Sequence, residues 1–219
     1  MILAIETTER FGSAALLDGN NVLAQVELPK DKRSSQTLHP AIEELFTQSG
    51  TLPNDITVLA VVNGPGSFTG LRVGVTAAKV FAYACGAEII AVSTFDAVKL
   101  ETSAVHSIGV DAQRGEVVVS LNGEPAQLMS VADWQKQREK YDHLVFTGPA
   151  LERYAAQMPP DAVLADERYW FPKAEAAGRW AAERIKHRQF DNVFTLLPVY
   201  SRLSAAEECL APQRRKTAE

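Results

Sequence analysis

The sequence predicts an α/β protein built from two similar units, and three observations lead to that prediction. Short apolar runs alternate with helix-length segments in the order β-β-β-α-β-α-β up to residue 92. A second series of three short apolar runs begins near residue 107. Helix-length segments between the later strands imply parallel crossover connections. We therefore expect a duplicated α/β unit whose join lies in 95–106.

The first unit opens with apolar runs at 2–5, 13–17 and 21–28, which we interpret as strands, with Asp18-Gly19 as a hairpin turn. A helix ending near Gly50 follows, because apolar residues recur there at helical spacing. The rest of the unit comprises a buried strand at 58–62, a glycine-rich loop, an apolar helix from about 71 to 85 and a strand at 89–92. That helix has almost no polar face, so it should be covered on several sides.

The second unit repeats the pattern less regularly. Its expected elements are strands at 107–111, 116–121 and 125–129, a helix at 131–140, a strand at 144–147, a helix at 150–157, a strand at 163–165 and a last helix after Pro172. We therefore predict an N-terminal subdomain at 1–100 and a smaller, degenerate one with a polar tail at 101–219.

Composition and net charge restrict the classes of function that this chain can have. The chain has 219 residues, 46% hydrophobic and 22% charged, as in an ordinary globular protein. Its net charge of −5 argues against nucleic-acid binding by the chain alone, although Arg214, Arg215 and Lys216 in the tail leave a minor RNA contact open. We expect no signal peptide, no membrane span and, with Cys85 and Cys209 far apart, a reducing cytoplasm.

The glycine-rich loop NGPGSFTGLRVG at 63–74 lies where a phosphate cradle would. Its G-x-G-x-x-x-G spacing is one residue too long for a dinucleotide fingerprint, and it lacks the lysine of a P-loop. Ser67 is one position early for a nucleophile elbow. The small residues Gly70, Gly74, Ala77 and Ala78 instead give one thin helix face. Internal packing or a partner helix would both explain that face.

Other catalytic groups are sparse. The histidines, His39, His106, His143 and His187, are too far apart in the sequence for a local metal motif. Glu6, Thr7 and Thr8 follow the first strand, an arrangement that holds Mg-phosphate in actin-like ATPases. An ordinary strand end and turn explains these residues equally well. An autonomous kinase, ATPase or peptidase using Glu6, Thr7, Thr8 or Ser67 therefore stays an alternative.

Ordered motifs over nearly the whole chain resemble the TsaB (YeaZ) family. They are ILAIETTERFGSAALL, RSSQTLHPAIEELF, AVVNGPGSFTGLRVGVTAAKVFA, VSTFDAV, VDAQRGEVVVSL and PVYSRLS. The resemblance implies two actin-like (ASKHA, ribonuclease H-like) subdomains. It also implies a non-catalytic subunit that binds and activates TsaD and works with TsaE in N6-threonylcarbamoylation of adenosine 37 of tRNA. Contact with tRNA would occur only through the complex.

The resemblance further implies that the partner surface lies on two helices, at about 35–49 and 70–84, and that the same surface forms homodimers when TsaD is absent. The residues we assign to it are Leu38, Ile42, Leu45, Phe46, Gly70, Gly74, Ala77, Ala78 and Phe81. No cofactor is expected for the chain alone, while ATP or ADP with Mg²⁺ is allowed at the subunit junction. Glu6, Ser34 and His39 depart from the family pattern of Asp, His and Leu.

Overall fold

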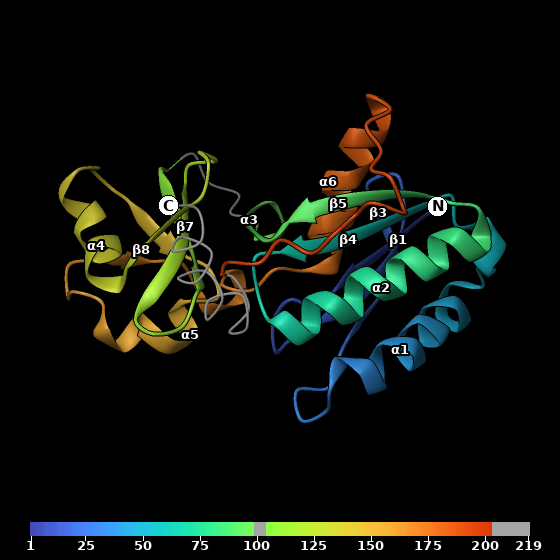
Figure 1. Cartoon of the computed structure of the whole chain (residues 1–219), viewed down its shortest axis with the longest axis horizontal. Coiled ribbons are helices and arrows are strands. Elements are labelled where there is room, and N and C mark those ends of the chain that lie inside the picture. The colour runs from blue at the N-terminus through green and yellow to red at the C-terminus, as the bar shows by residue number, and fades with distance from the viewer. Residues whose placement is uncertain (99–103, 203–219) are drawn as a thin grey trace, which may run out of the picture.

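The structure is a computed structural model that describes residues 1–98 and 104–202. Two α/β units lie side by side, each built on a five-stranded sheet (Figure 1). The predicted boundary at 100/101 and the tail residues Cys209, Arg214, Arg215 and Lys216 lie outside the described residues. No helix within the described ranges is long and apolar enough to cross a membrane.

The first sheet has the strand order β3-β2-β1-β4-β5. Its strands are β1 (Ile2–Glu6), β2 (Ser13–Asp18), β3 (Asn21–Glu27), β4 (Val58–Gly64) and β5 (Glu88–Ser93). β1, β2 and β3 pair antiparallel, whereas β1, β4 and β5 pair parallel, as the crossover argument predicts. Because side chains alternate along each strand, both faces of this sheet carry apolar residues and both need a cover.

Three helices cover those faces. α1 (Ser34–Ser49) and α2 (Phe68–Cys85) pack on one face, over a core that includes Leu3, Leu16 and Leu59. α6 (Ala174–Lys186) packs on the other face, over Ile2, Leu17 and Val62 among others. The short helix α3 (Thr94–Ala97) follows β5, and a 3₁₀ turn (Pro53–Asp55) precedes β4.

The second sheet repeats this order as β10-β9-β6-β7-β8, which confirms the predicted duplication. Its strands are β6 (His106–Asp111), β7 (Glu116–Leu121), β8 (Gln127–Ser130), β9 (Val145–Thr147) and β10 (Val163–Leu164). α4 (Val131–Lys136) and α5 (Leu151–Tyr154) are short, and each continues into a 3₁₀ turn, Gln137–Glu139 and Ala155–Gln157. A further 3₁₀ turn (Glu167–Tyr169) leads to α6. The second unit is therefore smaller and degenerate, as expected.

The prediction that 101–219 forms one subdomain needs a correction. Helix α6 falls in that range, but it packs on the first sheet, so the chain crosses back after building the second unit. Gly178 permits this approach, because a β-carbon there would collide with the Leu17 side chain. The segment 191–202, which we call the strap, continues along the first unit: Asp191 N–H donates to Ile89 O over 2.8 Å and Val199 N–H to Asn63 O over 2.7 Å.

Candidate partner surface and interdomain cleft

A cleft of about 620 Å³ lies where the two units meet. Glu6 ends β1 and Asp111 ends β6, so the two carboxyl groups occupy equivalent positions in the duplicated sheets. Residues that line the cleft include Glu9, Ser67, Phe68, Asp111, Glu152 and Arg153. Of the predicted site residues, Glu6, Thr7 and Thr8 lie together beneath this cleft, but all three are buried.

Glu6 is bonded to its own turn. Its Oε1 accepts hydrogen bonds from Thr8 N–H at 2.5 Å and from Thr8 Oγ1 at 2.7 Å. Burial raises the pKa of Glu6 to about 8, even though the bonds from Thr8 act in the opposite direction. Thr7 Oγ1 donates to Gly70 O at 2.8 Å. Both threonine hydroxyl groups are therefore engaged inside the protein.

These residues do not fit a phosphate site. A phosphate needs accessible donors and a favourable potential, whereas the hydroxyl donors here are buried and already bonded. Burial raises the pKa of Glu9 well above its usual value, and the nearby carboxyl groups of Glu6, Glu152 and Asp111 raise it further. The raised pKa values favour the neutral form of the Glu6 and Glu9 carboxyl groups, so the engaged hydroxyl groups of Thr7 and Thr8, and not charge, oppose a phosphate at this turn.

The glycine-rich loop packs against the same turn. A β-carbon at Gly66 would lie 2.7 Å from Thr8 O, and one at Gly70 would overlap Thr7 O. Ser67 N–H donates to Thr8 O over 2.7 Å. Ser67 Oγ accepts from Gly70 N–H at 3.4 Å, so Ser67 caps α2 and the helix begins at Phe68, earlier than predicted. These glycines bring the helix onto the β1–β2 turn.

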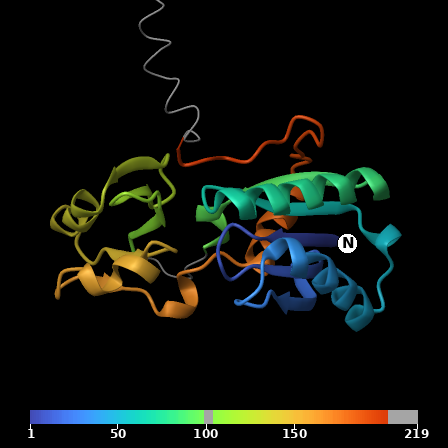
Figure 2. The same ribbon diagram turned by 60° about the horizontal axis from the view of Figure 1, so that its bottom comes forward.

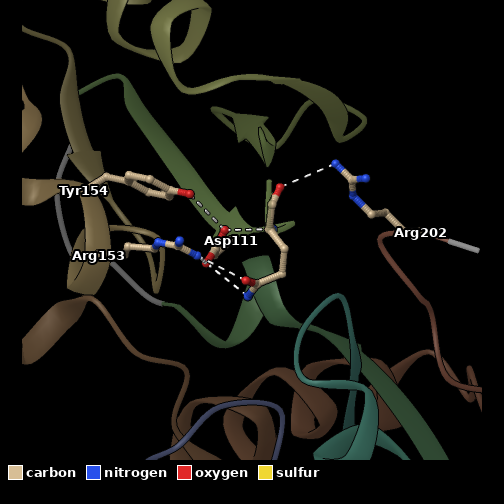
Figure 3. A network of polar contacts seen from close by, with 5 residues as sticks. Asp111, Arg153, Tyr154 and Arg202 are labelled. Atoms are coloured by element: carbon tan, nitrogen blue, oxygen red, sulfur yellow. Dashed lines mark hydrogen bonds and ion pairs between the residues drawn. The ribbon is translucent and has the colours of Figure 1, made fainter. Parts of the chain in front are cut away.

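The second-unit side of the cleft is held by a polar network around Asp111 (Figure 3). Asp111 Oδ1 accepts from Gln113 N–H at 2.8 Å and from Tyr154 Oη at 3.3 Å, and Oδ2 accepts from Arg153 Nη1 at 3.2 Å. Arg202, from the strap, donates from Nη2 to Gln113 O at 3.4 Å. Sequence reasoning missed Asp111, although its place at the end of the first strand of the second unit matches that of Glu6.

The predicted partner residues also need a correction. Most of them are buried in the core of the first unit: Leu38, Ile42, Leu45, Gly70, Gly74 and Ala78. Gly74 faces Thr7, not a partner, because a β-carbon there would overlap Thr7 Oγ1. Phe46, Ala77 and Phe81 are half-buried, and the rings of Phe46 and Phe81 stack at 6.1 Å between α1 and α2. Helical periodicity identified the inward faces.

The outward face of α2 carries the accessible apolar residues. Val73, Ala77, Val80 and Ala84 follow one another at helical spacing, and we call this row the α2 crest. Val80 is 62% exposed, and on the flank of the crest Tyr83 is 73% exposed. On the strap, Phe194 and Leu197 are 73% and 70% exposed. The lack of a polar face on α2 was the sequence signal for this surface.

The remaining candidates stay separate. His39 lies on the exposed side of α1, 3.4 Å from Glu43. Within the described residues, 1–98 and 104–202, no group of three histidine, cysteine, aspartate or glutamate side chains is arranged to hold a metal ion. Ser67 serves as the cap of α2.

Known proteins show what this arrangement is similar to. A family model described as TsaD, tRNA N6-adenosine threonylcarbamoyltransferase, matches residues 21–178. The TsaB protein of Escherichia coli is 40% identical over 94 residues, 42% of this chain and 40% of that protein. The solved structure of YeaZ from Pseudomonas aeruginosa has a TM-score of 0.74 and 22% identity over 91% of this chain and 98% of its own, which supports the actin-like fold.

The tRNA threonylcarbamoyladenosine biosynthesis protein TsaB of Bacillus subtilis extends the similarity to nearly the full length. It is 32% identical over 223 aligned positions, covering 94% of this chain and 96% of the relative. The ordered motifs, the duplicated fold and this full-length match agree, and the chain belongs to the TsaB family of tRNA threonylcarbamoyladenosine biosynthesis proteins.

Proposed function

We propose that this chain is a non-catalytic subunit that binds a TsaD-type protein and activates it in N6-threonylcarbamoylation of adenosine 37 of tRNA. The observation that carries the proposal is the α2 crest, a row of apolar side chains without a charge, in which Val80 and Ala84 are exposed and Val73 and Ala77 are half-buried. Contiguous exposed apolar surface is typical of protein–protein contact sites. TsaE acts with the pair, and two copies of this chain associate through the crest when TsaD is absent.

The crest suits a helix of similar shape. Val73 and Ala77 are half-buried, so a partner helix can approach α2 closely while Val80 supplies apolar area. The TsaD family model matches a range of this chain that contains α2, so a TsaD-type protein has a counterpart helix to offer. Such an interface has an apolar core and a polar rim. Glu43 and Glu44, at exposed positions of α1, would form part of that rim.

The cleft supports a non-catalytic role. Its predicted phosphate contacts are buried, and their hydroxyl groups are already engaged: Thr8 donates to Glu6 and Thr7 donates to Gly70 O. In the proposed function, any nucleotide used by the complex is bound with the partner's residues. The residues of this chain keep the β1–β2 turn rigid under α2, which fixes the crest for docking.

The test compares Val80→Asp with Leu52→Asp. Leu52 is a matched control, because it is 65% exposed on the turn before β4 and lies outside the crest. Each variant is mixed with TsaD and TsaE, and complex mass and tRNA modification are measured. We expect Val80→Asp to abolish both and Leu52→Asp to retain both. Full modification with Val80→Asp, or without the chain, would contradict the proposal.

A further inference from the structure

We propose that the strap forms a second wall of the docking surface, so that the TsaD-type partner contacts Phe194 and Leu197 as well as the α2 crest. The inference rests on the proposed function for the identity of the partner. It adds a contact area from the far end of the sequence, beyond the two helices to which the family resemblance assigns the partner surface.

The backbone of the strap is held in place beside α2 (Figure 2). Lys79 Nζ donates to Phe194 O at 3.1 Å and to Leu196 O at 3.0 Å, which ties the middle of α2 to the strap. Val199 N–H donates to Asn63 O, and Asn63 Nδ2 donates to Leu197 O at 3.4 Å. These four bonds fix the path of the strap over several residues.

Aromatic contacts secure both ends of that path. Near the start of α2, the Phe68 and Tyr200 rings lie 4.8 Å apart, and Arg72 Nε donates to Tyr200 Oη at 3.0 Å. Near the end of α2, the Tyr83 and Phe194 rings meet edge to face at 6.2 Å. The strap therefore follows α2 along most of its length, and its apolar side chains are continuous with the flank of the helix.

The side chains of the strap point to opposite sides. Leu196 is buried and joins the core of the first unit, whereas Phe194 and Leu197 are largely exposed. Two large apolar side chains on a fixed backbone are unfavourable in water but favourable under a partner. Because the backbone is already ordered, a partner that covers them pays less conformational entropy on binding.

The charges on this surface indicate which kind of partner it suits. Two cations lie between α2 and the strap: the Lys79 ammonium group donates to two carbonyl oxygens, and Arg72 Nε donates to Tyr200 Oη. The surface from Val80 across to Leu197 is therefore suited to an apolar partner, not to an acidic one. A TsaD-type protein fits, since the model of its family covers α2 and so predicts a counterpart helix. The strap itself lies beyond the matched range of 21–178.

The test uses the double variant Phe194→Ser/Leu197→Ser in the full chain, with TsaD affinity measured by calorimetry. We expect at least a tenfold weaker affinity and a melting temperature close to that of the wild type, because both side chains are exposed. The matched control is Leu52→Ser/Leu128→Ser, which alters two exposed leucines outside the surface and should leave the affinity unchanged.

Three outcomes separate the two proposals. If Val80→Asp abolishes binding and the strap variant binds normally, the strap inference is wrong and the proposed function stands. If neither variant weakens binding, the proposed function itself is contradicted. If the strap variant changes only self-association of the chain, the occupant is a second copy and the inference is overturned. Should the double variant unfold, amide hydrogen exchange of the wild type decides: binding of TsaD must slow exchange at 192–200.

Discussion

Gly74 of α2 lies directly over Thr7 of the β1–β2 turn, so closely that a β-carbon at position 74 would overlap Thr7 Oγ1. The same hydroxyl donates to Gly70 O at 2.8 Å. The thin face of α2 therefore serves contact within the chain. A bulky residue at Gly74 or Ala78 would disturb the core before it reached a partner, so such variants cannot map the docking surface.

The Gly74–Thr7 contact predicts a specific coupling. Gly74→Ala should lower the free energy of unfolding by about 1–3 kcal/mol, because the added methyl group meets Oγ1. Thr7→Ala removes that atom, and the next side-chain contact of a β-carbon at position 74 is 3.6 Å away. In the Thr7→Ala background, Gly74→Ala should therefore cost little. Urea denaturation of the four proteins measures the coupling, and strictly additive costs would contradict this account.

Burial of Glu6 predicts that stability falls as pH rises. The folded chain keeps Glu6 protonated up to a pKa of about 8, whereas the unfolded chain loses that proton near 4.5. Between these values the folded state binds more protons, so the contribution of Glu6 to stability is full below pH 4.5 and declines by up to about 1.4 kcal/mol per pH unit above it.

Glu6→Gln tests this directly. The amide stays neutral, so the variant should have a flatter pH profile of unfolding free energy from pH 5 to 8 and should be more stable than the wild type at pH 8. Glu27→Gln, on an exposed position of β3, is the matched control and should keep the wild-type slope. Parallel profiles for Glu6→Gln and the wild type would show that Glu6 ionises normally in the folded chain.

The buried hydrogen bond between Trp134 and Ser107 predicts that removing its acceptor destabilises the second unit. Trp134 Nε1 donates to Ser107 Oγ at 2.8 Å, and that hydroxyl donates to Gln137 Oε1 at 2.7 Å. Ser107→Ala leaves the buried indole N–H without its acceptor, which should cost about 1–3 kcal/mol. Thermal unfolding followed by tryptophan fluorescence measures the loss. Ser35→Ala, on the exposed start of α1, should change little, and equal melting temperatures for both variants would refute the prediction.

The contacts of Arg202 predict that the strap stabilises the β6–β7 turn of the second unit. Its guanidinium group pairs with Glu116 and donates to Gln113 O, across the β6–β7 turn. Arg202→Met should therefore accelerate amide hydrogen exchange in 112–116 and leave the β1–β2 turn unchanged. Lys186→Met, which breaks an exposed ion pair with Glu183 on α6, is the control and should not alter exchange in the β6–β7 turn. Unchanged exchange in 112–116 with Arg202→Met would show that Arg202 does not stabilise the β6–β7 turn.

Local pattern predicted much of the fold. The succession of strands and helices along the chain follows from apolar runs of strand length separated by Asp18-Gly19 and helix-length segments, and most elements lie within a few residues of their predicted bounds. Helix lengths in the second unit were overestimated, because α4 and α5 each continue as a 3₁₀ turn. The candidate site was predicted less well: periodicity finds apolar residues without showing whether the covering surface is the chain's own sheet or a partner.

The sequence by itself determined the duplicated α/β order and the membership of the TsaB family, since both rest on local spacing and on ordered motifs. Only the tertiary structure decided which faces stay exposed. Gly178 meets Leu17 and Val199 meets Asn63 across more than a hundred residues, and these contacts bring α6 and the strap back to the first unit. Burial depends on such long-range packing, so no local pattern could show that Thr7 fills the thin face of α2 or that Phe194 and Leu197 stay exposed beside it.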